Sequence, residues 1–165
     1  MNQSLSEKDL AEFALLGLKY KLLRLEQIVA WVDELIDERD NPPTWAIELA
    51  MASDAETAGS ILRWIRGDVT PDLPAKLIGG LLLRRRDCGA LNWRDVTGFV
   101  SDLYDREYGR EEDLRLIPRQ LAYDLIISEE WFYQHELSEA DMDALVDLIL
   151  LPFHDYEILL PGWAC

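Results

Sequence analysis

The spacing of the apolar residues constrains the fold of this chain more than any other feature of its sequence. Apolar side chains recur three and four residues apart along most of its length, as at Ile28, Val32 and Leu35, and this spacing places them on one face of a helix. No stretch longer than four residues alternates apolar and polar residues as a half-buried strand does. We therefore expect an all-α fold of about seven or eight short helices, either a globular bundle or a short stack of helical hairpins.

Helix start signals divide this pattern into separate segments. In four places a Ser or Asn is followed three residues later by an acid, which is the pattern of a capping box. These pairs are Ser4 with Glu7, Ser53 with Glu56, Asn92 with Asp95, and Ser138 with Asp141. A helix over residues 25–38 is expected to end before Asn41, which can cap the next helix with Pro42 at its first position. The apolar segment 153–165 is expected to pack as an irregular C-terminal arm.

Length and composition indicate one folded domain over residues 1–165. A chain of 165 residues with 49% hydrophobic residues can fill a single core. Its 16 basic and 32 acidic residues give a net charge of −16. Direct binding to nucleic acid or to an anionic membrane needs a basic surface, so the sequence argues against both.

The cellular compartment is predicted from three features. Two cysteines, Cys88 and Cys165, are too few for a disulfide framework and are typical of a reducing cytosol. The N-terminal segment carries Glu7, Asp9 and Glu12 where a signal peptide needs an uncharged stretch. The longest uncharged runs are far below the roughly 20 residues of a membrane helix. We therefore expect a cytoplasmic protein.

The sequence offers no positive support for catalysis, a metal or a cofactor. His135 and His154 are 19 residues apart, and the sequence contains no His-x-x-x-His, Cys-x-x-Cys or Glu-x-x-His pattern of a metal site. No Gly-rich phosphate-binding motif is present either. We therefore expect a protein that is not an enzyme and that carries neither a metal nor a cofactor. An enzyme stays open as an alternative if a pocket encloses either histidine with two carboxylates.

Acidic residues are concentrated in the C-terminal part of the sequence. Residues 120–165 contain ten acids and no Lys or Arg. Tryptophan and tyrosine are frequent anchors of protein interfaces, and Trp131 with Tyr133 is the preferred pair among these acids, with packing in the core as the alternative. The candidate partner-binding residues of this region are Glu129, Glu130, Trp131, Tyr133 and Glu136.

A second acidic cluster lies where a helix tolerates acids least. Its members are Asp33, Glu34, Asp37, Glu38 and Asp40, at the C-terminal end of the helix predicted over residues 25–38. The helix dipole is negative at this end, and like charges four residues apart repel by about 0.2–0.5 kcal/mol per pair. Only Arg39 lies nearby to relieve the repulsion. One explanation is a solvated acidic surface, which aids solubility. A basic partner would also remove the repulsion, so these five residues are predicted to bind a partner as the alternative.

The stretch over residues 16–52, LGLKYKLLRLEQIVAWVDELIDERDNPPTWAIELAMA, resembles small helical bacterial immunity proteins of polymorphic and contact-dependent toxin systems. The similar features are a GLKY-x-LL lead, a W-x-D-x-x-I helix, and Pro-Pro before W-x-IEL. This resemblance implies a cytoplasmic antidote that binds one cognate toxin domain, often a nuclease, and performs no chemistry. No contact position carries over from it.

Three hypotheses about function follow. The first is an immunity protein, or toxin inhibitor, that occludes the active site or substrate surface of a basic toxin. The second is an acidic DNA mimic, which needs carboxylates spaced like phosphates along an elongated face. The third is a helical adaptor or subunit, whose signature would be an apolar groove or an exposed tail over residues 158–165. The oligomeric state stays open.

Overall fold

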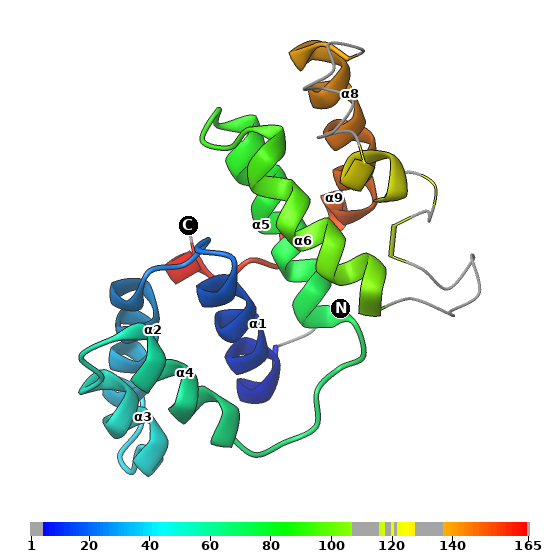
Figure 1. The fold of residues 1–165 in the computed structure, drawn as a ribbon. Helices are drawn as coiled ribbons and strands as arrows, with labels where there is room; N and C mark the ends of the chain where they lie inside the picture. The colour runs from blue at the N-terminus through cyan, green and yellow to red at the C-terminus, as the bar shows by residue number, and fades with distance from the viewer. Residues whose placement is uncertain (1–4, 107–115, 118–119, 121, 128–136, 165) are drawn as a thin grey trace. The chain divides into compact units, whose positions relative to one another are not determined.

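A computed structural model describes residues 5–106, 116–117, 120, 122–127 and 137–164 (Figure 1). Over these residues the regular secondary structure is entirely helical, which confirms the all-α class. The chain divides into two compact units, the first made of Met1–Leu81 and Leu159–Cys165 and the second of Leu82–Ile158. The prediction of a single domain stays a prediction. No helix of the described ranges combines the length and apolar character needed to cross a membrane.

The helices follow one another as the capping signals suggest. Unit 1 contains α1 (Glu7–Lys19), α2 (Leu25–Asp37), α3 (Thr44–Ala50), α4 (Ala55–Trp64), the first part of α5 (Leu73–Asp87) and the 3-10 helix η3 (Gly162–Ala164). Unit 2 contains the end of α5, then α6 (Trp93–Arg106), α8 (Glu139–Leu150), the 3-10 helix η2 (Leu151–Phe153) and α9 (His154–Glu157). Residues 122–127 are also helical.

The core of unit 1 forms where the apolar faces of its first four helices meet. Helix α2 packs on α3, α1 packs on α4, and α3 packs on α4. The core residues are Ala11, Ala14, Ile28, Trp31, Val32, Leu35, Ala46, Leu49, Ala58, Leu62 and Ile65. In α2 the buried residues are those that the helical spacing assigns to one face, so its acids are left on the opposite side.

The C-terminal segment completes the core of unit 1. The Trp163 ring stacks on Trp31 at a centroid distance of 5.3 Å and contacts Phe13 at 5.7 Å. The side-chain amide of Gln27 donates a hydrogen bond to the Trp163 carbonyl oxygen. The segment 153–165, predicted to pack as an irregular arm, contains the short helices α9 and η3. Leu160 and Ala164 are buried, whereas Ile158 is 81% exposed, so the stretch 158–164 is neither wholly covered nor wholly exposed.

Helix α1 begins two residues later than expected. Its N-cap is Ser6, which forms a reciprocal capping box with Asp9 in place of the predicted Ser4 and Glu7 pair. The buried Asp9 carboxylate also accepts hydrogen bonds from the backbone N and Oγ1 of Thr70, at 2.7 and 3.1 Å. This contact ties the start of α1 to a segment 61 residues away. Burial raises the pKa of Asp9, but hydrogen bonds from Ser6 and Thr70 outweigh it and hold that pKa below its ordinary value.

The other predicted caps divide into two that are wrong and two that are confirmed. Asp54, not Ser53, caps α4, because its carboxylate accepts from the Thr57 backbone N at 2.7 Å. Helix α3 begins at Thr44 with Pro43 as N-cap, so neither Asn41 nor Pro42 has its predicted position. The caps of α6 and α8 are confirmed. At α6 the Asn92 side-chain oxygen accepts a hydrogen bond from the Arg94 backbone N, and the Asp95 carboxylate accepts one from the Asn92 backbone N. At α8 Ser138 forms a capping box with Asp141.

Unit 2 is built around two aromatic side chains that are almost fully buried, Trp93 and Phe153. Helix α6 packs against α8, and the Phe99 ring meets Phe153 edge-on at 6.1 Å. Helix α8 contributes Met142, Val146, Ile149 and Leu150 to the buried side. This packing places the acids of α8 within reach of arginines on α5 and α6.

Candidate functional site

The predicted acidic cluster of α2 lies on the surface of unit 1. Asp33, Glu34, Asp37, Glu38 and Asp40, hereafter the α2 acidic end, are all exposed. Trp31, Val32 and Leu35 of the same helix are buried, so the core fixes which way the carboxylates face. The last turn of α2 contains no basic residue. The unfavourable placement of these acids at the negative end of the helix dipole is therefore present in the folded protein.

The α2 acidic end has no cation within the described part of the chain. No ion pair joins any of its five carboxylates to another described residue. The sequence suggested that Arg39 relieves the repulsion, but the Arg39 guanidinium pairs with Glu7 of α1 instead. Five exposed carboxylates consequently remain available to a partner at one end of one helix.

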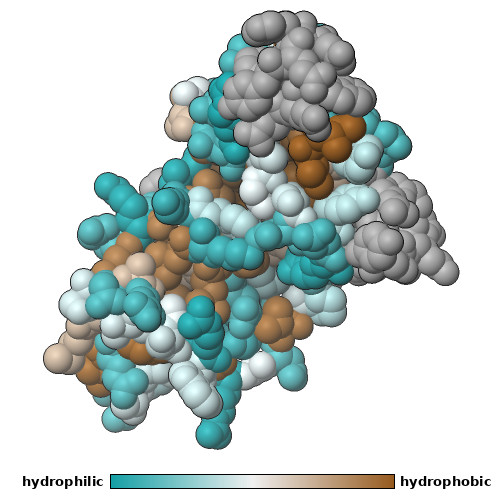
Figure 2. Space-filling model, viewed as in Figure 1, coloured by the Kyte–Doolittle hydropathy of each residue, from teal (hydrophilic) through white to brown (hydrophobic). Residues whose placement is uncertain are grey.

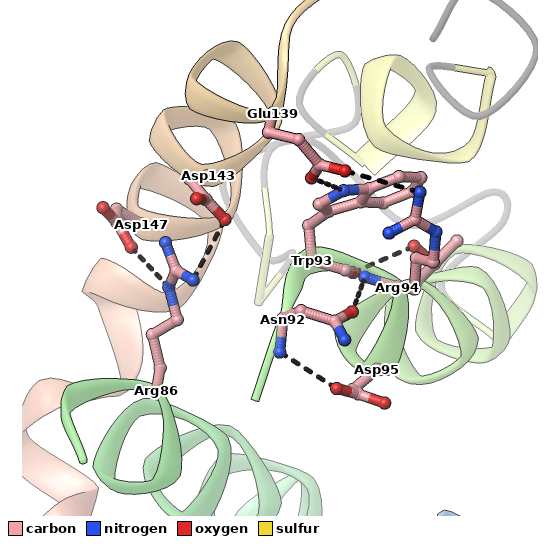
Figure 3. Close-up of polar contacts among 9 residues, drawn as sticks. Arg86, Asn92, Trp93, Arg94, Asp95, Glu139, Asp143 and Asp147 are labelled. Atoms are coloured by element: carbon pink, nitrogen blue, oxygen red, sulfur yellow. Dashed lines mark hydrogen bonds and ion pairs between the residues drawn. The ribbon is translucent and has the colours of Figure 1, made fainter. Parts of the chain in front are cut away.

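The second predicted cluster lies outside the described residues. Its members are Glu129, Glu130, Trp131, Tyr133 and Glu136, and their role in binding stays a prediction. The acids that follow them on α8 are described, and three of them, Glu139, Asp143 and Asp147, are paired with arginines of their own unit (Figure 3). The C-terminal region is therefore less free to attract a cation than its sequence suggested.

Arg86, at the end of α5, bridges two carboxylates of α8. Its Nη1 lies 3.0 Å from an Asp143 oxygen, and its Nε lies 3.1 Å from Oδ1 of Asp147. Figure 3 shows the guanidinium between these two side chains. Burial lowers the pKa of Arg86, but the hydrogen bond that Arg86 donates to Asp147 and the charge of Asp143 outweigh it and raise that pKa. Arg86 thus stays charged and holds both acids in place.

Glu139, in the first turn of α8, is held by neighbouring residues of α6. The indole Nε1 of Trp93 donates a 2.7 Å hydrogen bond to Oε2 of Glu139, and Arg94 Nη2 lies 3.6 Å from Oε1. The Arg94 guanidinium also lies over the Trp93 ring, 4.3 Å from its centroid. In the same unit Arg84 pairs with Glu157 at 3.3 Å. Arg84 and Arg86 lie in the last turn of α5, where cations also suit the helix dipole, and they pair with acids far away in the sequence.

The tryptophans differ widely in exposure. Trp31 and Trp93 are buried, and Trp45 and Trp163 are half-buried, but the Trp64 side chain is 84% exposed. The helical spacing of α4 accounts for this, because Ala58 and Leu62 face the core and Trp64 lies on the opposite side. The exposure of Trp64 therefore follows from the same spacing that buries Ala58 and Leu62.

The histidines provide no catalytic centre in the described ranges. His154 is exposed, with its Nδ1 3.8 Å from Asp155, so no pocket encloses it. His135 lies outside the described residues. Within those ranges no group of three or more His, Cys, Asp or Glu side chains is arranged to hold a metal ion.

Comparison with known proteins does not place this chain in a family. No protein-family model, no curated protein and no solved structure matches this sequence. The resemblance of residues 16–52 to immunity proteins therefore stays a prediction, and the α2 acidic end stands on its geometry alone.

Proposed function

We propose that this chain is an immunity protein, or antitoxin, that binds a cognate basic toxin domain and blocks its active site or substrate surface. The observation that carries the proposal is the α2 acidic end. Its five carboxylates are exposed and have no ion pair within the described residues. Their position at the end of α2 costs stability, and a positively charged partner would remove that cost.

A nuclease is the class of toxin that best fits this surface. Enzymes that bind nucleic acid carry Lys and Arg against the phosphate backbone, and the same residues complement carboxylates. A chain with net charge −16 would also speed the encounter, since electrostatic steering raises association rates to about 10⁸–10⁹ M⁻¹s⁻¹ at low salt. A standard interface takes about 800 Å² from each partner, which the exposed side of α2 and its neighbours in unit 1 can supply.

Protection of growing cells tests the proposal. The toxin candidate is the protein encoded by the neighbouring reading frame. The chain is produced together with this candidate in host cells whose growth the candidate stops. The reversal variant Asp33→Lys/Asp37→Lys removes the proposed contact. Its matched control, Glu48→Lys/Asp68→Lys, changes the net charge equally at two exposed acids of unit 1 outside the α2 acidic end.

We expect the unmodified chain and the control to restore growth and the α2 reversal to lose protection. Failure of the unmodified chain to protect would contradict the immunity function. Full protection by the α2 reversal would show that an inhibitor acts through another surface. Circular dichroism of each purified variant checks that it is folded.

A further inference from the structure

Helix α8 is apolar on two opposite faces. Its inner face, formed by Met142, Val146, Ile149 and Leu150, is buried. Its solvent-facing side, hereafter the α8 outer face, consists of Ala140, Ala144, Leu148 and, one turn further, Leu151 of η2. Residues spaced by three or four positions are neighbours on a helix surface, so these four form a continuous apolar strip. A surface helix ordinarily carries polar residues on this side.

The strip is exposed in the folded chain. Leu148 is 55% and Leu151 is 66% exposed, and both alanines are exposed as well. On the face shown in Figure 2, hydrophilic residues cover most of the surface and apolar residues lie in separate groups among them. Single apolar residues are common on protein surfaces, whereas Leu148 and Leu151 are two exposed leucines aligned on one helix.

Carboxylates border the α8 outer face. Asp143 and Asp147 precede Ala144 and Leu148 in the sequence and run along one edge of the strip. Their side chains are 42% and 62% exposed, whereas the Arg86 side chain that joins them is only 18% exposed. The arginine is thus mostly covered, and the carboxylates present their charge to solvent in fixed positions. A partner at this strip meets an apolar centre with an acidic rim.

We propose that the α8 outer face is a docking surface for a basic partner protein whose apolar side chains cover Leu148 and Leu151 while its Lys or Arg side chains meet Asp143 and Asp147. This inference rests on the proposed function, since it assigns the basic toxin a second, apolar point of contact. An apolar centre with a polar rim is the usual anatomy of a protein interface. A second copy of this chain fits less well, because it would bring a second set of the same carboxylates against this rim.

A peptide probe tests this surface without the toxin. The probe is a labelled 18-residue amphipathic helix of Leu and Lys, and its control has the same Leu face with Glu replacing Lys. Binding to the full chain is followed by fluorescence anisotropy. The variant Leu148→Gln/Leu151→Gln removes the apolar anchor without changing charge. Met51→Gln, at a 79% exposed apolar residue of unit 1, is the matched control.

We expect Leu148→Gln/Leu151→Gln to weaken binding of the Leu/Lys peptide at least tenfold and Met51→Gln to change it less than twofold. The Leu/Glu peptide should bind at least tenfold more weakly than the Leu/Lys peptide. The inference would be overturned if the leucine variant bound the Leu/Lys peptide as tightly as the unmodified chain does. It would also be overturned if the unmodified chain bound the Leu/Glu and Leu/Lys peptides equally. Light scattering that finds a dimer, which the leucine variant converts to a monomer, would overturn it in favour of a second copy.

The growth assay separates this inference from the proposed function. Peptide binding that follows these expectations in a chain that fails to protect cells would reject the immunity function and leave the docking surface intact. Protection by the unmodified chain together with peptide binding that ignores Leu148 and Leu151 would reject the docking surface alone. Both leucines are exposed, so their replacement should leave the melting temperature within about 2 °C of the unmodified chain.

Discussion

The acids of α2 and the acids of α8 differ in what faces them within their own units. Asp143 and Asp147 share Arg86, and Glu139 meets Trp93 and Arg94. The acids of the α2 acidic end meet no cation among the described residues, and Arg39 turns away from them to Glu7. Acidic residues that lie close together in sequence thus have different surroundings in the fold. Glu139, Asp143 and Asp147 of α8 pair with arginines of their own unit, whereas the α2 acidic end has no ion pair among the described residues.

The comparison changes which of the two acidic regions is expected to attract a cation more strongly. Residues 120–165 contain no Lys or Arg, so the sequence makes the C-terminal region look like the stronger anion. Arg84, Arg86 and Arg94 come to it from α5 and α6 and neutralise part of its charge. Local charge density in the sequence is therefore a poor guide to the charge that a partner meets.

The largest expected effect concerns a paired carboxylate in unit 1. Asp9→Ala should lower the free energy of unfolding by about 2–3 kcal/mol at pH 7, because hydrogen bonds to a charged group each contribute about 1.5–3 kcal/mol. Asp9 accepts such bonds from Ser6 and Thr70. Urea unfolding followed by circular dichroism measures the loss.

The same variant gives a pH dependence with a definite sign. Because the pKa of Asp9 is lowered in the folded protein, its ionised form stabilises the fold above the ordinary carboxyl pKa of about 3.9. That contribution is lost as the pH falls through the lowered pKa. The difference between the unmodified chain and Asp9→Ala should therefore be constant above about pH 5 and shrink toward pH 2–3. A difference that stays constant over the whole range would contradict a role for the charge.

Breaking the bridge at α8 should have the next largest effect. Arg86→Met should lower the free energy of unfolding by about 1–2 kcal/mol, since it leaves Asp143 and Asp147 without their shared cation and the pair is partly screened by solvent. Arg63→Met is the control, because Arg63 is exposed and pairs with no described residue. The free energy of unfolding of Arg63→Met should stay within about 0.5 kcal/mol of that of the unmodified chain. If Arg86→Met and Arg63→Met changed the free energy of unfolding equally, the ion pairs of Arg86 would not stabilise the fold.

Matched pairs of neutral substitutions sharpen the comparison directly. Asp37→Asn/Glu38→Gln should raise the free energy of unfolding by about 0.5–1 kcal/mol, because it removes acids from the negative end of the α2 dipole. Asp143→Asn/Asp147→Asn makes the same change in charge and should lower stability by a similar amount, because it removes both partners of Arg86. Thermal unfolding at low salt measures the stability of both double variants against that of the unmodified chain. Stability changes of the same sign in the two variants would contradict the account.

Helix content could be predicted from the sequence because it depends on residues three and four apart. The α6 and α8 caps follow from the local pairs Asn92 with Asp95 and Ser138 with Asp141. The α1 cap does not, because two overlapping pairs fit the same pattern. The structure selects Ser6 with Asp9, and Asp9 is also held by Thr70, a contact 61 residues away that no local pattern contains.

The exposure of the α2 acids was also predictable, since the spacing of Ile28, Val32 and Leu35 assigns the core side of α2. Their lack of cations was not predictable. The side chain of Arg39 pairs with Glu7 of α1 and not with the acids next to Arg39 in sequence. This pairing depends on how α1 and α2 pack, which a local sequence pattern does not contain. The exposed leucines of the α8 outer face were overlooked because an apolar helix is ordinarily assigned to the core.

The affinity of Asp37→Asn/Glu38→Gln for the toxin partner, measured at low and high salt, tests the central claim most directly. If the α2 acidic end exists to meet a basic protein, this variant should bind at least about tenfold more weakly at low salt while being more stable than the unmodified chain. The two affinities should converge as salt screens the contact. Unchanged affinity at both salt concentrations would contradict the claim that these acids are placed there for a partner.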